Sequence, residues 1–226
     1  TKLVGSGSAD ASGNWTITTG TLEDNTYSIY ASATDKAGNI SGNSEPSNLI
    51  VDSEATKPST PDLDSGYDTG SSDSDNKTSL GILVFSGTSE SGSTIELYGS
   101  AGEMIGSTQS SSAGVWTITS GALSDGVHEI SAKATDNAGN VSAASGKLYI
   151  TVDANPPEQP SMPDLKPVDD TGESDSDNKT SINIVGITGT VEPNSQVELL
   201  ISNPSGSDNV IYATGYSDAS GFWSIS

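Results

Sequence analysis

The chain has 226 residues, of which 31% are hydrophobic, and it carries 30 acidic against 8 basic side chains, for a formal net charge of −22. This charge disfavours binding to nucleic-acid phosphates or anionic lipid, and it favours cations and cationic surfaces as partners. The absence of cysteine excludes disulfides and thiolate metal sites, and no apolar run approaches the roughly 18 residues that membrane insertion requires.

The sequence repeats itself with a period of about 100 residues, the size of a small domain. The segment around Trp15 superposes on the segment around Trp116, and ATDKAGN at 33–39 superposes on ATDNAGN at 134–140. We therefore expect three repeats, of which only the second is whole. The expected parts are the second half of one repeat at 1–53, a complete repeat at 54–154, and the first two thirds of a third at 155–226.

Short runs of apolar or alternating residues, separated by turn residues, are typical of an antiparallel β-sandwich. In the complete repeat, alternation places Ile130, Ala132 and Ala134 on one face, and Leu148, Ile150 and Val152 share a face in the same way. We expect seven strands, the number in an immunoglobulin-like domain, but without its disulfide. These strands are expected at about 61–64, 79–88, 94–100, 104–111, 115–120, 127–135 and 141–152.

The junctions between repeats, SEATKPSTP and ANPPEQPSMP, are rich in proline, which favours extended, semi-rigid connections. The expected fold is therefore all-β, with tandem immunoglobulin-like antiparallel β-sandwiches joined by short Pro-rich linkers in an extended rod. The third repeat also contains an additional segment, SNPSGSDN at 202–209, which we expect at the tip of a hairpin.

An acidic stretch occurs twice, at 61–79 and at 163–181. Closely spaced carboxylates repel one another unless a cation neutralises them, and Ca²⁺ accepts six to eight oxygen ligands in irregular geometry. Asp64 is a poor ligand candidate, because Lys166 replaces it in the second copy, which also adds Asp169. The remaining candidate ligands are Asp62, Asp68, Asp73 and Asp75 in the first copy and Asp164, Asp170, Asp175 and Asp177 in the second. The alternative is that each stretch is a solvated acidic turn.

A second acidic motif contains Asp35 in one repeat and Asp136 in the next, in the turn between the last two expected strands. In a seven-strand sandwich that turn lies at the end where the chain enters from the preceding domain. It should therefore face the exit carboxylate, Asp52 or Asp153, of the repeat before it, an arrangement that could place calcium at the junctions. Alternatively, the Asp and Asn side chains build an Asx-type turn and the glycine between them supplies a positive φ.

Catalysis is not expected from these carboxylates. The Asp-Thr-Gly triplets at Asp68 and Asp170 invite comparison with aspartic proteases, whose two carboxylates share a proton at one buried site. Here the triplets lie in polar surroundings and in separate repeats. His128, the only histidine, cannot build a triad or a histidine metal site, and it aligns with Tyr27, where sandwiches often place a structural corner tyrosine.

Tryptophan recurs in register in all three repeats, each time followed two residues later by isoleucine on the same face of the strand. This pattern predicts core positions rather than a sugar-stacking platform for Trp15, Trp116 and Trp223.

Taken together, the motifs PDLxxxxDTGxSxSDNxT, SGTxExGSxxELY, DASGNW, ATDxAGNxS and a closing TVD resemble the bacterial Ig-like domains repeated in giant surface adhesins. These adhesins are typically exported by type I secretion, and the resemblance covers essentially the whole chain. It implies an extracellular rod at the bacterial surface, stiffened by calcium near the junctions between neighbouring repeats, and we expect this spacer to be non-enzymatic and monomeric. Such a spacer projects a distal domain toward a host-cell receptor or glycan; alternatively, the repeats contact that receptor or glycan themselves. Carried onto matching positions, the implied calcium ligands are Asp62, Asp68, Asp73, Asp75, Asp164, Asp170, Asp175, Asp177, Asp35 and Asp136.

Overall fold

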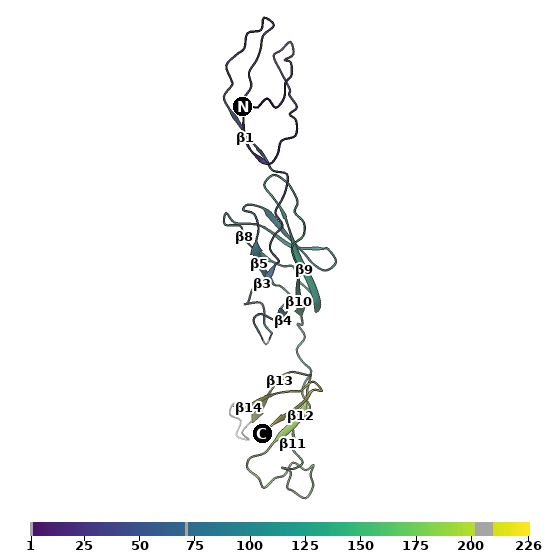
Figure 1. Ribbon diagram of the computed structural model, residues 1–226. Coiled ribbons are helices and arrows are strands. Elements are labelled where there is room, and N and C mark those ends of the chain that lie inside the picture. Colours follow the sequence, from purple (N-terminus) through teal and green to yellow (C-terminus); the bar gives the residue numbers. More distant parts are fainter. Residues whose placement is uncertain (1, 71, 202–209) are drawn as a thin grey trace. The chain divides into compact units, whose positions relative to one another are not determined.

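In this computed structural model, every regular element in the described residues is a β-strand, which confirms the all-β prediction (Figure 1). The structure describes residues 2–70, 72–201 and 210–226. The chain divides into two compact units, 1–154 and 155–226. Within the described residues no helix is long and apolar enough to cross a membrane.

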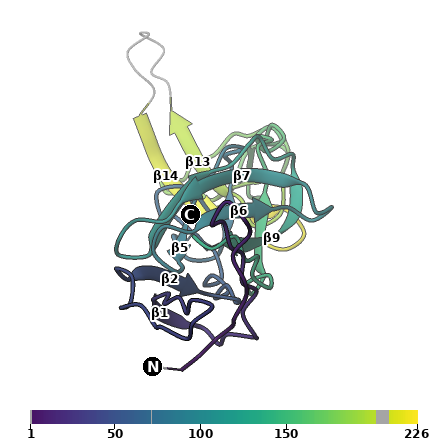
Figure 2. The ribbon, with the colours of Figure 1, turned by 90° about the horizontal axis from the view of Figure 1, so that it is seen from above.

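Residues 54–154 form a sandwich of two sheets. The three-stranded sheet has the order β3-β5-β8 and consists of β3 (Asp62–Leu63), β5 (Val84–Thr88) and β8 (Val115–Thr119). The five-stranded sheet has the order β4-β10-β9-β6-β7 and consists of β4 (Lys77–Thr78), β6 (Thr94–Tyr98), β7 (Met104–Gln109), β9 (Gly126–Thr135) and β10 (Leu148–Val152). Figure 2 shows its neighbouring strands β6 and β7 from above.

The core lies between these two sheets and follows the alternation of the strands. Ile130, Ala132 and Ala134 on β9 are buried, and Ile150 and Val152 on β10 are buried beside them, as predicted. Burying such apolar side chains is the main driving force for folding. The complete cluster consists of Leu63, Leu83, Phe85, Ile95, Leu97, Trp116, Ile118, Ile130, Ala132, Ala134, Ile150 and Val152.

The expected strand at 79–88 is shorter than predicted and begins at Val84. Thr78 pairs with Val152 of β10 in one sheet, whereas Val84 pairs with Thr119 of β8 in the other. The intervening residues 79–83 therefore carry the chain from one sheet to the other. The β4–β10 pair is parallel, in contrast to the purely antiparallel sandwich that the sequence predicts.

The expected strand at 141–152 is also shorter, because serine side chains replace part of its main-chain ladder. The hydroxyl of Ser142 accepts a hydrogen bond from the main-chain nitrogen of Ala134, and that of Ser145 accepts one from Ala132, each at 2.9 Å. Because the serine hydroxyls accept hydrogen bonds from these two main-chain NH groups, the NH groups do not need a carbonyl of a neighbouring strand as acceptor. Regular pairing with β9 resumes at Leu148.

Residues 1–53 form one two-stranded sheet of β1 (Asn25–Ile29) and β2 (Ser47–Val51). Trp15 is 57% exposed, so the prediction of a core position is wrong for this tryptophan. In the complete repeat, Gly87 of β5 lies against the ring of Trp116 and covers it. The segment 1–53 contains no counterpart of β5, and Trp15 therefore lacks this cover.

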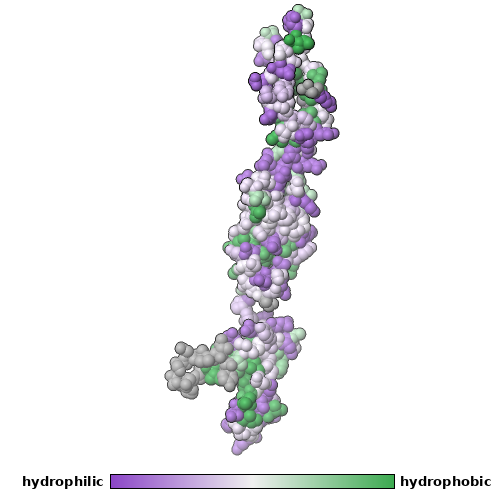
Figure 3. Space-filling view, turned by 60° about the vertical axis from the view of Figure 1, so that its left-hand side comes forward, coloured by the Kyte–Doolittle hydropathy of each residue, from purple (hydrophilic) through white to green (hydrophobic). Residues whose placement is uncertain are grey.

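The unit 155–226 has a small core of its own around Val197, Trp223 and Ile225, which confirms the prediction for Trp223. One sheet, in the order β11-β12-β15, consists of β11 (Asp164–Leu165), β12 (Ile187–Thr190) and β15 (Phe222–Ile225). A second sheet pairs β13 (Gln196–Ile201) with β14 (Val210–Tyr216). The SNPSGSDN segment lies outside the described residues. Apolar surface is visible on this unit in Figure 3, and its exposed apolar residues include Met162, Val168, Ile184, Leu200 and Ile201.

Candidate functional site

The first acidic stretch folds into a loop that is held by the carboxylate of Asp68. This residue is only 7% exposed. Its Oδ2 accepts a hydrogen bond from the main-chain nitrogen of Asn76 at 2.9 Å, and its Oδ1 accepts one from Lys77 at 3.1 Å. Asn76 has a φ of 58°, a left-handed conformation that Asn tolerates better than most residues. The Asp68 carboxylate therefore organises the loop by accepting main-chain hydrogen bonds.

The second acidic stretch repeats this geometry with one difference. The Oδ2 of Asp170 accepts a hydrogen bond from Asn178 at 3.0 Å, and Asn178 again has a positive φ, of 56°. The Oδ1 of Asp170 is buried and has no hydrogen-bond partner within the described residues. Because a buried polar oxygen without a partner carries a desolvation cost, this atom is the one in the loop best placed to accept another donor or a cation.

A hydroxyl contact also recurs in the two loops. The Oγ1 of Thr69 accepts a hydrogen bond from the main-chain nitrogen of Ser79, and that of Thr171 accepts one from Ser181, each at 2.8 Å. The recurrence of the acidic stretch therefore has a structural cause, which is a loop with one conserved pattern of internal hydrogen bonds in both copies.

The other carboxylates of these stretches do not converge. Asp75 lies 3.5 Å from the ammonium of Lys77, and Asp177 lies 3.3 Å from that of Lys179. The remaining four candidate ligands have exposed side chains: Asp62, Asp73, Asp164 and Asp175. In the part of the chain that the structure describes, no group of three or more acidic or histidine side chains comes together in a way that could hold a metal ion.

The Asp136 motif forms the Asx-type turn that the sequence suggested. The Oδ1 of Asp136 accepts hydrogen bonds from the main-chain nitrogens of Ala138 and Asn140, each at 2.8 Å, and Gly139 has a φ of 94°. The Nδ2 of Asn140 donates to Asp136 Oδ2 at 2.8 Å. This amide and the two NH groups favour the charged carboxylate, so they hold the pKa of Asp136 below its ordinary value.

The Asp35 motif makes the same turn in the first repeat. Its Oδ1 accepts from the main-chain nitrogens of Ala37 and Asn39, and its Oδ2 accepts from Asn39 Nδ2, all at 2.8 Å. The Asn39 amide is likewise the largest cause that lowers the pKa of Asp35. Asp35 is exposed, whereas Asp136 is 8% exposed.

Sequence reasoning missed two further copies of this turn. Asp10 and Asp218 accept hydrogen bonds from the residues two and four positions later, and Gly13 and Gly221 have positive φ values of 82° and 84°. The signal was present in DASGN and DASGF, where an aspartate precedes a glycine by three positions. Each of these carboxylates satisfies main-chain donors within its own turn.

At the junction of the first two repeats, the Asp136 turn contacts the exit of the preceding repeat. The Nδ2 of Asn140 donates to the main-chain carbonyl oxygen of Asp52 at 2.9 Å. The turn therefore lies beside the exit residue, as predicted, but the contact joins a side-chain amide to a main-chain carbonyl and does not involve the Asp52 carboxylate. The side chain of Asp52 turns back to its own linker, where its Oδ1 accepts from Glu54 at 3.4 Å.

Each linker is attached to the repeat that follows it. Ser59 donates its main-chain nitrogen to the carbonyl of Thr88, and its Oγ accepts from the nitrogen of Thr88, both at 2.9 Å. Ser161 and Thr190 repeat the pair at 2.8 Å. A short linker whose end is fixed in this way cannot separate far from its sandwich.

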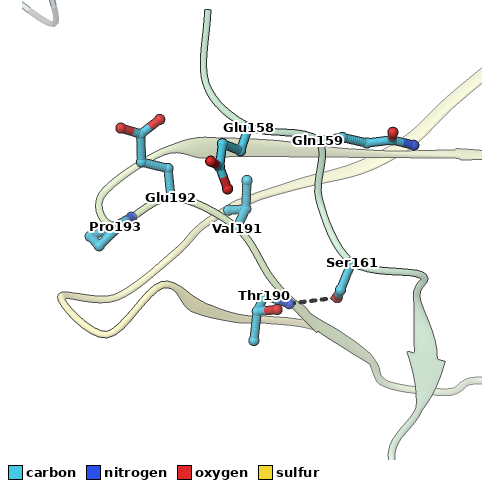
Figure 4. Close-up of a pocket in the computed structure, with 7 residues that line it drawn as sticks. All are labelled: Glu158, Gln159, Ser161, Thr190, Val191, Glu192 and Pro193. Carbon is cyan, nitrogen blue, oxygen red and sulfur yellow. Dashed lines mark hydrogen bonds between the residues drawn. The ribbon is translucent and has the colours of Figure 1, made fainter.

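A depression of ≈ 560 Å³ lies beside the second of these anchors (Figure 4). Its two acidic residues, Glu158 and Glu192, lie toward the opposite end from the hydrogen bond between Ser161 and Thr190. The Ser161 hydroxyl accepts that bond and donates to the main-chain carbonyl of Met162 at 3.4 Å, and among the described residues its contacts include no general base. The depression is a feature of the linker attachment.

A protein-family model for the bacterial Ig-like domain matches residues 1–53 and 54–154. The chain belongs to this family. No curated protein is a significant match. One solved structure that matches is described as a biofilm associated protein, BSP domain, at 15% identity, with a TM-score of 0.30. The match covers 68% of this chain and 23% of that one, and at this TM-score the likeness carries no argument.

The bacterial Ig-like assignment fits the position of the Asp-Thr-Gly triplets. Asp68 and Asp170 belong to different compact units, and each accepts main-chain hydrogen bonds within its own loop. An aspartic protease needs two carboxylates that share a proton at one site. The two aspartates hold equivalent structural positions in their two acidic loops.

A second depression, of ≈ 570 Å³, lies in residues 1–53 and is lined by Tyr27, Ile29 and Tyr30 among others. Ile29 aligns with Ile130 of the complete repeat, which is fully buried. The depression therefore corresponds to the inner face of an Ig-like sandwich, since 1–53 contains no counterpart of β3 to β6. It offers no specific support for a glycan site.

Proposed function

We propose that this chain is part of an extracellular spacer of a bacterial surface adhesin, in which tandem Ig-like repeats hold a distal binding domain away from the cell. The observation that carries this proposal is the attachment of the linkers, at Ser59 and again at Ser161. Each attachment shortens the free part of the linker that joins two repeats. Length and limited flexibility are the properties that a spacer needs.

The spacer proposal is tested by exchanging one repeat in the intact adhesin on living bacteria. Residues 54–154 are replaced by a sequence-unrelated folded domain of similar length, and adhesion to host cells is measured. A spacer depends on length and not on side chains, so adhesion should persist. Loss of adhesion with normal surface display would instead support direct contact of the repeats with a receptor or glycan.

We propose further that Ca²⁺ binds weakly at the acidic loops, in the range of about 10⁻⁴ to 10⁻³ M that is typical of extracellular modules. Two observations support this: the net charge of −22 and the buried Oδ1 of Asp170 without a hydrogen-bond partner. In the first loop both carboxylate oxygens of Asp68 already accept main-chain hydrogen bonds. The second loop is therefore the better candidate, and Asp170 is its central ligand.

Calcium binding is tested by NMR titration of the 226-residue chain up to ~10 mM Ca²⁺, well above the expected dissociation constant. Amide shifts in 163–181 should saturate, and Asp170→Asn should weaken the binding more than the matched Asp68→Asn variant. Absence of any calcium-dependent shift would reject calcium and leave the spacer proposal intact. Small-angle scattering with calcium and then EDTA tests stiffening, which an unchanged maximum dimension would contradict.

A further inference from the structure

We infer that the Asp136–Asn140 turn is a docking site for the exit strand of the preceding Ig-like repeat, with Asn140 as the residue that recognises a main-chain carbonyl of that strand. The inference rests on the spacer function proposed above and deepens it, because it names the contact that joins successive repeats. The partner is a peptide carbonyl, so neither a metal ion nor a particular side chain is required.

Asn140 can make this contact without giving up its place in the turn. A side-chain amide carries two N–H donors. One hydrogen of Asn140 Nδ2 goes to Asp136 Oδ2 at 2.8 Å, and the other goes to the carbonyl oxygen of Asp52 at 2.9 Å. The Asp136 carboxylate therefore orients the amide, and the second hydrogen points at the neighbouring repeat.

The turn has the same geometry in the first repeat, where the structure describes no strand beside it. In the first repeat, Asn39 Nδ2 donates to Asp35 Oδ2 at the same 2.8 Å, and within the described residues it has no contact that corresponds to Asp52. The amide is therefore oriented before docking. A preorganised donor loses little conformational entropy when it binds, which favours the contact.

The two copies of the turn differ in burial, partly because residues 1–53 contain no counterparts of β3 to β6. The exposed fraction is 8% for Asp136, beside the exit of the preceding repeat, whereas Asp35 is exposed although its hydrogen bonds are the same. The acceptor lies directly after Val51, the last residue of β2. Because the recognised group is a carbonyl, the side chain at this exit position can change without loss of the contact.

The experiment uses two spin labels on the 226-residue chain, which has no cysteine that would compete for labelling. Thr18→Cys and Thr117→Cys place one label on each of the first two repeats. Double electron–electron resonance then measures the distribution of distances between the two labels in EDTA. Asn140→Ala should broaden this distribution. Asn39→Ala removes the same internal hydrogen bond from the undocked turn, so it should leave the width unchanged.

A second measurement needs no substitution at the junction. The side-chain amide protons of Asn140 should exchange with solvent up to about tenfold more slowly than those of Asn39, since a hydrogen bond of ordinary net strength must open first. An unchanged distribution in a folded Asn140→Ala chain, or equal exchange at both residues, would overturn the docking site. Neither result depends on calcium or on adhesion, so the spacer proposal is judged separately.

Discussion

His128 Nε2 lies 2.7 Å from the carbonyl oxygen of Ser124, at the position where the hydroxyl of Tyr27 donates to the carbonyl of Glu23 at 2.8 Å. In two equivalent strands, side chains of different chemistry thus make a hydrogen bond to the main-chain carbonyl four positions earlier. An imidazole with its hydrogen on Nε2 donates as a phenol does. The predicted structural role of His128 is confirmed by this contact.

Replacement of His128 by tyrosine should therefore change the free energy of unfolding by less than about 0.5 kcal/mol, a change typical of tolerated surface sites. His128→Ala should lower it by about 1 kcal/mol, because the Ser124 carbonyl loses its donor. Urea denaturation followed by tryptophan fluorescence measures both. Equal losses for the tyrosine and alanine variants would show that the hydrogen bond is not what the position requires.

Gly87 should tolerate no side chain, since an added Cβ would overlap the ring of Trp116. Gly87→Ala should lower the free energy of unfolding by about 1–3 kcal/mol, the usual cost of overpacking a core. Gly121→Ala is the matched control, because the nearest atom to its added Cβ is 3.8 Å away and Gly121 has no positive φ. Thermal unfolding of the two variants should separate them clearly, and a stable Gly87→Ala chain would contradict the close packing.

Asp68→Ala should destabilise the complete repeat by about 1–3 kcal/mol, because the main-chain nitrogens of Asn76 and Lys77 lose their acceptor. The effect should be present in EDTA, since it does not involve a metal ion. Asp73→Ala, at an exposed position of the same loop, should change stability by less than about 0.5 kcal/mol. A loss that appears only in calcium would show that Asp68 acts as a ligand instead.

Acid should weaken the turns that Asp35 and Asp136 hold. The folded-state pKa of each is lowered from the unfolded value of 3.8, so each carboxylate adds stability above that pH. This contribution is lost as the pH falls below 3.8 and through the folded-state pKa. Urea midpoints at pH 7, 4 and 3 should decline, and Asp136→Asn should flatten the decline. A variant as acid-sensitive as the parent chain would assign the effect to other carboxylates.

The sandwich could be predicted from the sequence because alternation is local: the burial of Ile130 and Ile150 follows from the period of a strand. The exposure of Trp15 was not predicted, because alternation within its own strand does not show that residues 1–53 contain no counterpart of β5 to cover it. The role of Asp68 could not be predicted either, since an acidic loop has the same composition whether its carboxylates contact main-chain NH groups or a cation. Its geometry depends on the positive φ of Asn76, which asparagine permits but does not dictate.

The parallel pairing of β4 with β10 bears on how a repeat responds to mechanical force. Thr151 donates its main-chain nitrogen to the carbonyl of Asn76, and Asp153 donates to that of Thr78, each at 2.9 Å. Tension along the chain pulls these parallel strands in opposite directions, so it loads the two bonds together in shear instead of opening them one after another. Single-molecule pulling should then extend the complete repeat in one abrupt step, and gradual lengthening would contradict this. The resistance of the complete repeat to force would then depend on the few main-chain atoms that make these two hydrogen bonds.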